Sequence, residues 1–150
     1  ATLSIYGDGA LKNVLLEQIV KNRMIDNIFL KGRSDNLPEI LANSSVFIMS
    51  SDFEGMPNSL MEAMAVGIPV ISTDCPTGPK ELIGNNERGY LIEIGNQEAL
   101  RKAIETVKTK KANAQEKALR AKMYVQSKFS PEEIVNKFIE ICDNYKELKE

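Results

Sequence analysis

Short apolar runs rich in β-branched residues alternate along the chain with stretches of helical periodicity. The runs are bounded by Gly, Asp, Ser or Pro, which is typical of buried strands. Between the first two runs, Leu11, Leu15 and Ile19 recur at a helical spacing. The pattern predicts strands at residues 2–6, 28–31, 46–49, 70–73 and 90–94, and helices around 11–19, 37–43 and 57–66 between them.

The alternation of strand and helix indicates how the strands are joined. Parallel strands need crossover connections of a dozen or more residues, usually a helix, and the segments between the predicted strands are of that length. The predicted fold class is therefore α/β, a Rossmann-like parallel sheet flanked by helices. In such sheets ligands bind at the carboxyl ends of the strands, so the loops that follow strands are the candidate functional segments.

Residues 95–150 are predicted to form a helical tail on an α/β core at residues 1–94. The tail divides into helices at 97–109, 112–127 and 131–148, the last capped by Ser130 with Pro131 in its first turn. An apolar stripe at 3.6-residue spacing runs along this last helix, formed by Ile134, Phe138, Ile141, Cys142 and Tyr145. We expect the stripe to pack on the protein's own sheet, with a groove of a partner as the alternative.

Size and composition favour one folded domain. A chain of 150 residues with 43% hydrophobic and 27% charged residues can bury a sizeable core. The formal net charge of -2 excludes a general attraction to nucleic acid, so an anionic ligand must be bound locally. The absence of histidine excludes Ser/His/Asp and Cys/His nucleophiles and His-containing zinc sites. Cys75 and Cys142 lie far apart and are expected to be reduced, buried thiols.

The segment Gly7-Asp8-Gly9 follows the first predicted strand and precedes a helix. A dinucleotide-binding fingerprint begins in this way, but its third glycine would fall at position 12, which is Lys12. NAD binding is therefore not expected. Gly7 and Gly9 are interpreted as a tight turn that lets the backbone pass close to a ligand above the sheet.

The loop after the third predicted strand leads into a helix and carries the most informative residues. Gly55 permits a sharp turn, and Pro57 suits the first helical position. The amides of Asn58 and Ser59 come next and have no partner within the helix. Free amides at the positive end of a helix dipole bind anions without Lys or Arg, so the sequence predicts a phosphate site here.

Two glutamates flank this helix start. Glu62 lies five residues beyond Pro57, about 7–8 Å along a helix at 1.5 Å per residue, which matches the reach from a diphosphate to a ribose. A carboxylate there can accept hydrogen bonds from both ribose hydroxyls, although on spacing alone a solvated glutamate is the simpler interpretation. Glu54 precedes the helix, where it either accepts hydrogen bonds from sugar hydroxyls or complements the helix dipole.

Three further positions also follow predicted strands. Thr77 and Gly78 lead into a second helix start and suit a close approach of the backbone to a ligand. Asp74 is either a turn residue or an acceptor for a hydroxyl. Arg33 either stacks on a base or is solvated. Two loops of this kind facing one cleft can hold a diphosphate and the sugar beyond it.

Glu54 and Glu62, separated by seven residues within FEGMPNSLMEAMAVGIPVI, resemble the donor-binding signature of the retaining glycosyltransferases of family four, which have a GT-B fold. The resemblance continues in IYGDGALKNVL, FLKGRSDNLPEIL, TDCPTGPKELI and RGYLI, in the order and approximate spacing of the family from about residue 3 to 94. It implies the C-terminal, nucleotide-sugar-binding domain of such an enzyme. The N-terminal acceptor domain and the first strand of the donor domain would precede Ala1, where the chain opens without Met.

The resemblance also assigns roles to individual residues. It implies that Glu54 contacts the donor sugar and acts in catalysis, and that Glu62 holds the ribose hydroxyls. Arg33 and Leu37 fall where the family sandwiches the base. The other donor-binding positions are Gly55, Met56, Pro57, Asn58 and Ser59, which meet sugar hydroxyls and phosphate, together with Gly7, Gly9, Thr77 and Gly78.

The implied activity is glycosyl transfer from a nucleotide-diphosphate sugar to an acceptor, with retention and with no obligatory metal or cofactor. The variant DCPTGPKE is similar to bacterial transferases of capsule, exopolysaccharide or glycan-on-lipid assembly. It implies a UDP-hexose or UDP-N-acetylhexosamine donor, a glycan or lipid-linked acceptor, and a cytoplasmic protein at the inner membrane face. The family's diphosphate-neutralising Arg and Lys would precede Ala1, so this portion alone is expected to be inactive.

The implied strand order and two other function classes stay open. The strand that would precede Ala1 belongs near the middle of a sheet ordered 3-2-1-4-5-6, so five strands either close up as 2-1-3-4-5 or leave a gap.

A non-catalytic nucleotide-sugar-binding or scaffold domain would keep the same cleft. A flavodoxin-like phosphoacceptor module is disfavoured, because no acidic cluster with a matching lysine surrounds Asp8 and Asp52. A related UDP-sugar 2-epimerase would need histidine.

Overall fold

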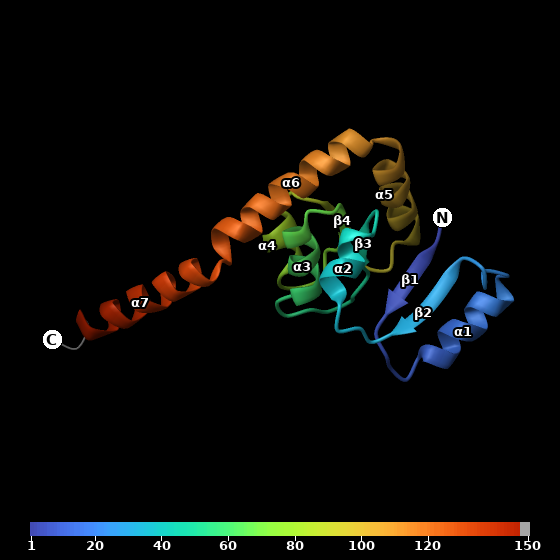
Figure 1. Cartoon of the computed structure of the whole chain (residues 1–150), viewed down its shortest axis with the longest axis horizontal. Helices are drawn as coiled ribbons and strands as arrows, with labels where there is room; N and C mark the ends of the chain where they lie inside the picture. Colours follow the sequence, from blue (N-terminus) through green and yellow to red (C-terminus); the bar gives the residue numbers. More distant parts are fainter. Residues whose placement is uncertain (148–150) are drawn as a thin grey trace. The chain divides into compact units, whose positions relative to one another are not determined.

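The computed structural model of the protein describes residues 1–147, in which strands and helices alternate up to residue 92 and three helices follow (Figure 1). The strands are β1 (Leu3–Tyr6), β2 (Ile28–Gly32), β3 (Phe47–Met49), β4 (Val70–Thr73) and β5 (Tyr90–Ile92). The helices are α1 (Lys12–Lys21), α2 (Leu37–Ala42), α3 (Asn58–Val66), α4 (Pro79–Ile83), α5 (Gln97–Thr109), α6 (Lys111–Lys128) and α7 (Pro131–Glu147). The predicted elements are confirmed with small shifts at their ends; position 148, predicted to be helical, lies outside the described residues.

The strands form two parallel sheets rather than one. β1 pairs with β2, from Leu3 opposite Ile28 to Tyr6 opposite Gly32. A second sheet has the order β3-β4-β5, with β4 in the centre. The closed order 2-1-3-4-5, one of the two arrangements that the sequence allowed, is therefore wrong, because within residues 1–147 β1 does not pair with β3. The pairing is interrupted where the resemblance placed a strand ahead of Ala1.

The chain divides into two compact units, Ala1–Leu37 and Pro38–Glu150. The strand pairing stops at the same place, and this accounts for the division. In the first unit α1 packs against β2 and buries Ile19. One helix covers only one face of a two-stranded sheet, so many large apolar side chains of this unit stay exposed. They are Leu3, Leu11, Val14, Leu15, Leu16, Val20, Met24, Ile25 and Phe29.

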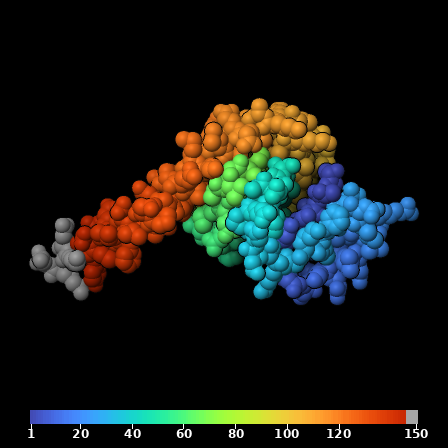
Figure 2. All heavy atoms as spheres, viewed as in Figure 1, coloured from blue at the N-terminus to red at the C-terminus, as the bar shows by residue number. Residues whose placement is uncertain are grey.

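The second unit has a well-buried core around β4. All four residues of this strand are buried, because β4 lies between β3 and β5 and contacts α3 and α5. From α3, the side chains of Leu60, Ala63 and Met64 are fully buried. α6 packs against α3, and Figure 2 shows the orange atoms of α6 next to the green atoms of α3. The buried residues of α6 are mostly small and follow a helical spacing: Ala114, Ala118, Ala121 and Val125.

Replacing a buried small residue of α6 is expected to destabilise the second unit. Ala121 is completely inaccessible to solvent, so Ala121→Leu adds three carbons where packing leaves no room. We expect the free energy of unfolding to fall by about 1–3 kcal/mol, measured by urea denaturation. Ala112→Leu is the matched control, because Ala112 is exposed in the same helix. Equal unfolding midpoints for the two variants would contradict the packing described here.

Two cation–aromatic contacts also join α6 to its neighbours, one to the segment between α4 and β5 and one to the start of β5. The Arg88 guanidinium carbon lies 3.9 Å from the centre of the Tyr124 ring, and the Lys117 ammonium lies 5.1 Å from that of Tyr90. Lys117 also donates a hydrogen bond to the carbonyl oxygen of Asn86. Partial burial lowers the pKa of Lys117 and raises the pKa of Tyr90. These contacts attach α6 at two points beyond its apolar stripe.

The prediction that α7 packs on the protein's own sheet is wrong. Its stripe residues Ile134, Phe138, Ile141 and Tyr145 are between 53% and 68% exposed, and Cys142 is exposed as well. The described contacts of the β3-β4-β5 sheet are with α3, α4 and α5. These helices contact that sheet, whereas α7 contacts α6 only where the two consecutive helices meet, and its side chains from Pro131 to Tyr145 are exposed.

The two cysteines differ in their surroundings. Both are free thiols; Cys75 is buried as predicted, whereas Cys142 is exposed because it belongs to the uncovered stripe of α7. Among the helices of residues 1–147, none combines the length and the hydrophobicity that a membrane crossing requires.

Candidate functional site

Two loops at the carboxyl ends of adjacent strands meet in the second unit. The Glu54 loop (residues 50–57) joins β3 to α3, and the Thr77 loop (residues 74–78) joins β4 to α4. They approach so closely that a Cβ atom on Gly78 would lie 2.5 Å from Cδ of Pro57 and 2.6 Å from the carbonyl oxygen of Gly55. Gly78 also has a φ of 89°, which side chains rarely adopt. Only glycine therefore fits between the loops, as the sequence indicated for Gly78.

Hydrogen bonds fix the backbone of the Glu54 loop at Ser51 and at Glu54 itself. The hydroxyl of Thr73, at the end of β4, donates to the carbonyl oxygen of Ser51. The hydroxyl of Thr77 lies 2.5 Å from the carbonyl oxygen of Glu54 and 2.7 Å from that of Pro76. Because a hydroxyl has a single hydrogen, these two carbonyls share it. Thr77 therefore helps to hold the residue that the sequence proposed as catalytic.

The carboxylate of Glu54 has a partner within its own loop. The Ser51 hydroxyl donates to Oε1 of Glu54 over 2.7 Å, and both side chains are partly buried. Next to Glu54, the side chains of Phe53 and Met56 are 75% and 51% exposed. The loop thus has a hydrogen-bonded carboxylate, that of Glu54, next to two exposed apolar side chains.

The start of α3 has the geometry expected of an anion site. Pro57 is buried and is the residue preceding the helix, which begins at Asn58, one position later than predicted. Among the described residues no side chain caps this end. The amides of Leu60 and Met61 both donate to the carbonyl oxygen of Pro57. The amides of Asn58 and Ser59 therefore have no intrahelical acceptor, and the helix dipole adds positive potential there.

Glu62 points away from the core of the second unit. It is exposed, whereas Leu60, Ala63 and Met64 on the opposite side of α3 are fully buried. It lies four positions after the helix start at Asn58, about 6 Å along the axis. Its carboxylate is therefore free of packing and lies one turn beyond the uncapped amides.

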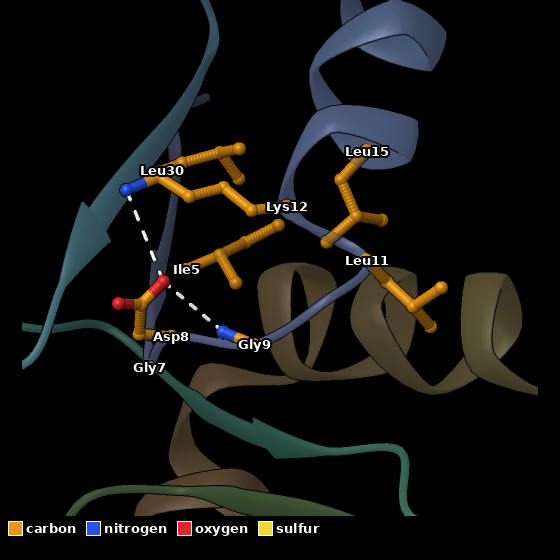
Figure 3. Close-up of a pocket in the computed structure, with 8 residues that line it drawn as sticks. All are labelled: Ile5, Gly7, Asp8, Gly9, Leu11, Lys12, Leu15 and Leu30. Atoms are coloured by element: carbon orange, nitrogen blue, oxygen red, sulfur yellow. Dashed lines mark hydrogen bonds and ion pairs between the residues drawn. The ribbon is translucent and has the colours of Figure 1, made fainter.

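The first unit carries the remaining predicted site residues. Gly7 and Gly9 line a shallow pocket of about 210 Å³ between β1, β2 and α1 (Figure 3). Oδ1 of Asp8 accepts the Gly9 amide at 3.1 Å and lies 3.9 Å from Nζ of Lys12. Lys12 stands where the dinucleotide fingerprint would have its third glycine, and it forms an ion pair with Asp8 instead.

Arg33 and Leu37 belong to this first unit as well. Arg33 is exposed just after β2, and Leu37 is half-buried at the start of α2. The structure brings together the predicted residues of the Glu54 and Thr77 loops and α3 in one unit, and Gly7, Gly9, Arg33 and Leu37 in the other. No group of three His, Cys, Asp or Glu side chains that could hold a metal ion occurs in the described part of the chain.

Sequence reasoning missed two residues of this site, Ser51 and Thr73. Both act through loop contacts, in which a hydroxyl reaches Oε1 of Glu54 in one case and a backbone carbonyl 22 positions earlier in the other. The Thr73 contact forms only because the ends of β3 and β4 meet. The Ser51 contact lies within one loop and depends on how that loop turns.

The fold and these loops agree with a comparison of the whole chain with protein families. The model of the glycosyl transferases group 1 matches residues 1–128. The chain belongs to this family. Its Rossmann-like α/β fold is that of the C-terminal domains of GT-B glycosyltransferases, as the resemblance implied.

Individual relatives cover the chain to different extents. An uncharacterized glycosyltransferase of Methanocaldococcus jannaschii is 47% identical over 83 residues, 55% of this chain and 20% of the relative. The N-acetylgalactosamine-N,N'-diacetylbacillosaminyl-diphospho-undecaprenol 4-alpha-N-acetylgalactosaminyltransferase of Campylobacter jejuni is 32% identical over 132 residues, 85% of this chain and 36% of the relative.

A solved structure extends the comparison to three dimensions. The chain superposes with a TM-score of 0.84 and 30% identity on a mutant of TarM of S. aureus in complex with fondaparinux, alpha-GlcNAc-glycerol and UDP, covering 93% of this chain and 28% of that one. The chain thus spans between about a fifth and a third of the length of these proteins.

Proposed function

We propose that this chain is the donor-binding part of a retaining glycosyltransferase, which transfers a sugar from a nucleotide diphosphate to a glycan or lipid-linked acceptor. The observation that carries the proposal is the uncapped start of α3, with amides of Asn58 and Ser59 available to an anion. A carboxylate stands on either side of it, Glu54 in the preceding loop and Glu62 one turn along the helix. In a nucleotide-diphosphate sugar the diphosphate lies between the sugar and the ribose. An anion site between two hydrogen-bond acceptors therefore matches the chemistry of such a donor.

Each residue of the proposed site has one role. The backbone of residues 55–59, in which every residue except Pro57 offers an N–H group, binds the diphosphate and nearby sugar hydroxyls, and the Thr77 loop supports it from the other side. Glu62 accepts hydrogen bonds from the ribose hydroxyls, and Glu54 accepts from hydroxyls of the donor sugar. In the first unit, Arg33 and Leu37 sandwich the base, and Gly7 and Gly9 keep the backbone close to the donor.

The chemistry proposed for this site is stabilisation of a leaving group. As the bond between the sugar and the diphosphate breaks, negative charge grows on the diphosphate, and preorganised amide donors stabilise that charge. The helix supplies part of this stabilisation. We propose that an Arg and a Lys on a strand-and-loop unit ahead of β1 in a longer protein supply the rest, and that a separate N-terminal domain binds the acceptor.

The donor is proposed to be a UDP-hexose or UDP-N-acetylhexosamine. The name of the Campylobacter relative specifies an N-acetylgalactosaminyl group and a diphospho-undecaprenol acceptor, and the TarM complex contains UDP. These two proteins support a uridine nucleotide and an acetamido sugar here as well. A lipid-linked acceptor would place the enzyme in the cytoplasm at the inner membrane face.

Titration calorimetry of the full-length protein with UDP-, GDP- and ADP-linked glucose and N-acetylglucosamine tests the proposal. We expect a UDP-sugar to bind at least tenfold more tightly than its GDP and ADP counterparts. Free N-acetylglucosamine serves as the control and is expected not to bind measurably, because most contacts are with the nucleotide diphosphate. Failure of every nucleotide sugar to bind would refute the donor-binding role.

A further inference from the structure

The Glu54 loop contains a serine whose contact goes beyond the roles proposed above. Ser51 lies three residues before Glu54, and its hydroxyl donates to Oε1 of that glutamate over 2.7 Å. The contact is partly buried, so water competes with it less than at the surface. A hydroxyl that donates to a carboxylate forms a charge-assisted hydrogen bond, stronger than one between neutral groups.

The backbone of the Glu54 loop is held by hydrogen bonds, so the remaining freedom of the Glu54 carboxylate comes from rotation of its side chain. Thr73 holds the carbonyl of Ser51, and Thr77 reaches the carbonyl of Glu54. Both ends of the segment that joins the two residues are thus tied to the end of β4 and to the loop after it. The Glu54 side chain nevertheless retains three rotatable bonds, and without a partner its carboxylate would sample several rotamers.

We propose that Ser51 is a positioning residue that fixes the Glu54 carboxylate for contact with the donor sugar. The Ser51 hydrogen bond occupies one carboxylate oxygen and leaves Oε2 to accept from a sugar hydroxyl. Holding the carboxylate before the donor arrives reduces the rotamer entropy lost on binding. This inference rests on the proposed role of Glu54 as the residue that meets the donor sugar.

The proposal predicts a split between two ligands that share the nucleotide. UDP lacks the sugar, so it meets the α3 amides and Glu62 but not Glu54. In the full-length protein Ser51→Ala should therefore weaken binding of UDP-N-acetylglucosamine, or of the tightest UDP-sugar found above, by about 3- to 10-fold. The affinity for UDP should stay unchanged. Titration calorimetry measures both affinities in the same preparation.

Matched variants separate positioning from a general loosening of the loop. Ser51→Thr keeps the hydroxyl and should restore most of the affinity for the UDP-sugar. Ser50→Ala removes the neighbouring exposed hydroxyl and should leave both affinities unchanged. In a Glu54→Ala background, Ser51→Ala should have no further effect, because the group through which it acts is gone.

Three results would overturn the inference. They are an equal fall in affinity for UDP and UDP-sugar, no fall for either, and a fall that persists in the Glu54→Ala background. The first would show that Ser51 only supports the loop that carries the phosphate-binding amides. A wild-type protein that binds no UDP-sugar would defeat the proposed function together with the inference, whereas wild-type binding with an indifferent Ser51→Ala would defeat the inference alone.

Discussion

Glu62→Ala in the full-length protein is expected to weaken binding of UDP by about 1.5–3 kcal/mol, a fall of about 10- to 150-fold in affinity. The reason is the loss of hydrogen bonds from the ribose hydroxyls to a charged acceptor. Glu62 is exposed on α3 and contributes nothing to the buried face of that helix. Alanine favours helix formation, so the substitution should leave the fold intact. Calorimetric titration with UDP measures the effect directly.

The matched control for Glu62→Ala removes the same charge far from the proposed site in sequence. Glu140 is exposed in α7, and Glu140→Ala should leave UDP affinity unchanged. The two variants have equal net charge, so a long-range electrostatic effect would move both. If Glu62→Ala binds UDP as the wild type does, Glu62 has no ribose contact and is a solvated residue of the helix surface.

Gly78→Ala is expected to lower the free energy of unfolding by about 2–5 kcal/mol. The added Cβ would lie 2.5 Å from Cδ of Pro57 and 2.6 Å from the carbonyl oxygen of Gly55, and the φ of 89° disfavours any side chain. Pro57 is fully buried and the oxygen belongs to the backbone, so neither can move aside cheaply. Such a loss is a large share of the roughly 5–15 kcal/mol that stabilises a typical domain.

Urea denaturation followed by circular dichroism measures this effect, and Gly55→Ala is the control. An added Cβ on Gly55 would meet nothing within 4 Å, although the residue lies in the same pair of loops. Its expected change is within about 0.5 kcal/mol, as for other substitutions at open positions. A Gly78→Ala protein as stable as the wild type would show that the two loops are not held in contact.

The local elements could be predicted from the sequence because their signals are local. The runs at Val70–Thr73 and Gln97–Thr109 have the composition and periodicity of a buried strand and an amphipathic helix, and both were predicted with the ends that the structure has. The uncapped start of α3 was also visible, since Gly55 and Pro57 mark a turn into a helix whose first amides have no partner within the helix. The assignment of Glu54 and Glu62 to one donor-binding signature depended on the resemblance to the family and not on the physical argument.

The course of the tail could not be predicted in the same way. Ile134, Phe138 and Ile141 form a clear apolar stripe, but periodicity states only that a helix has an apolar face and not which surface covers it. The structure shows that α3, α4 and α5 already contact the β3-β4-β5 sheet. Which helices reach the sheet is a property of the assembled fold, so the stripe of α7 was assigned wrongly.

By itself, the sequence determined the order and type of the elements, the family, and which loop carries the candidate chemistry, because each depends on residues close together in the chain. The tertiary structure alone decided that the strands form two separate sheets, that Gly78 lies against Gly55 and Pro57, and that Thr77 contacts the carbonyl oxygen of Glu54. Glu54 and Thr77 are 23 residues apart in sequence, and their loops meet only because β3 and β4 are parallel neighbours. Strand pairing sets that proximity.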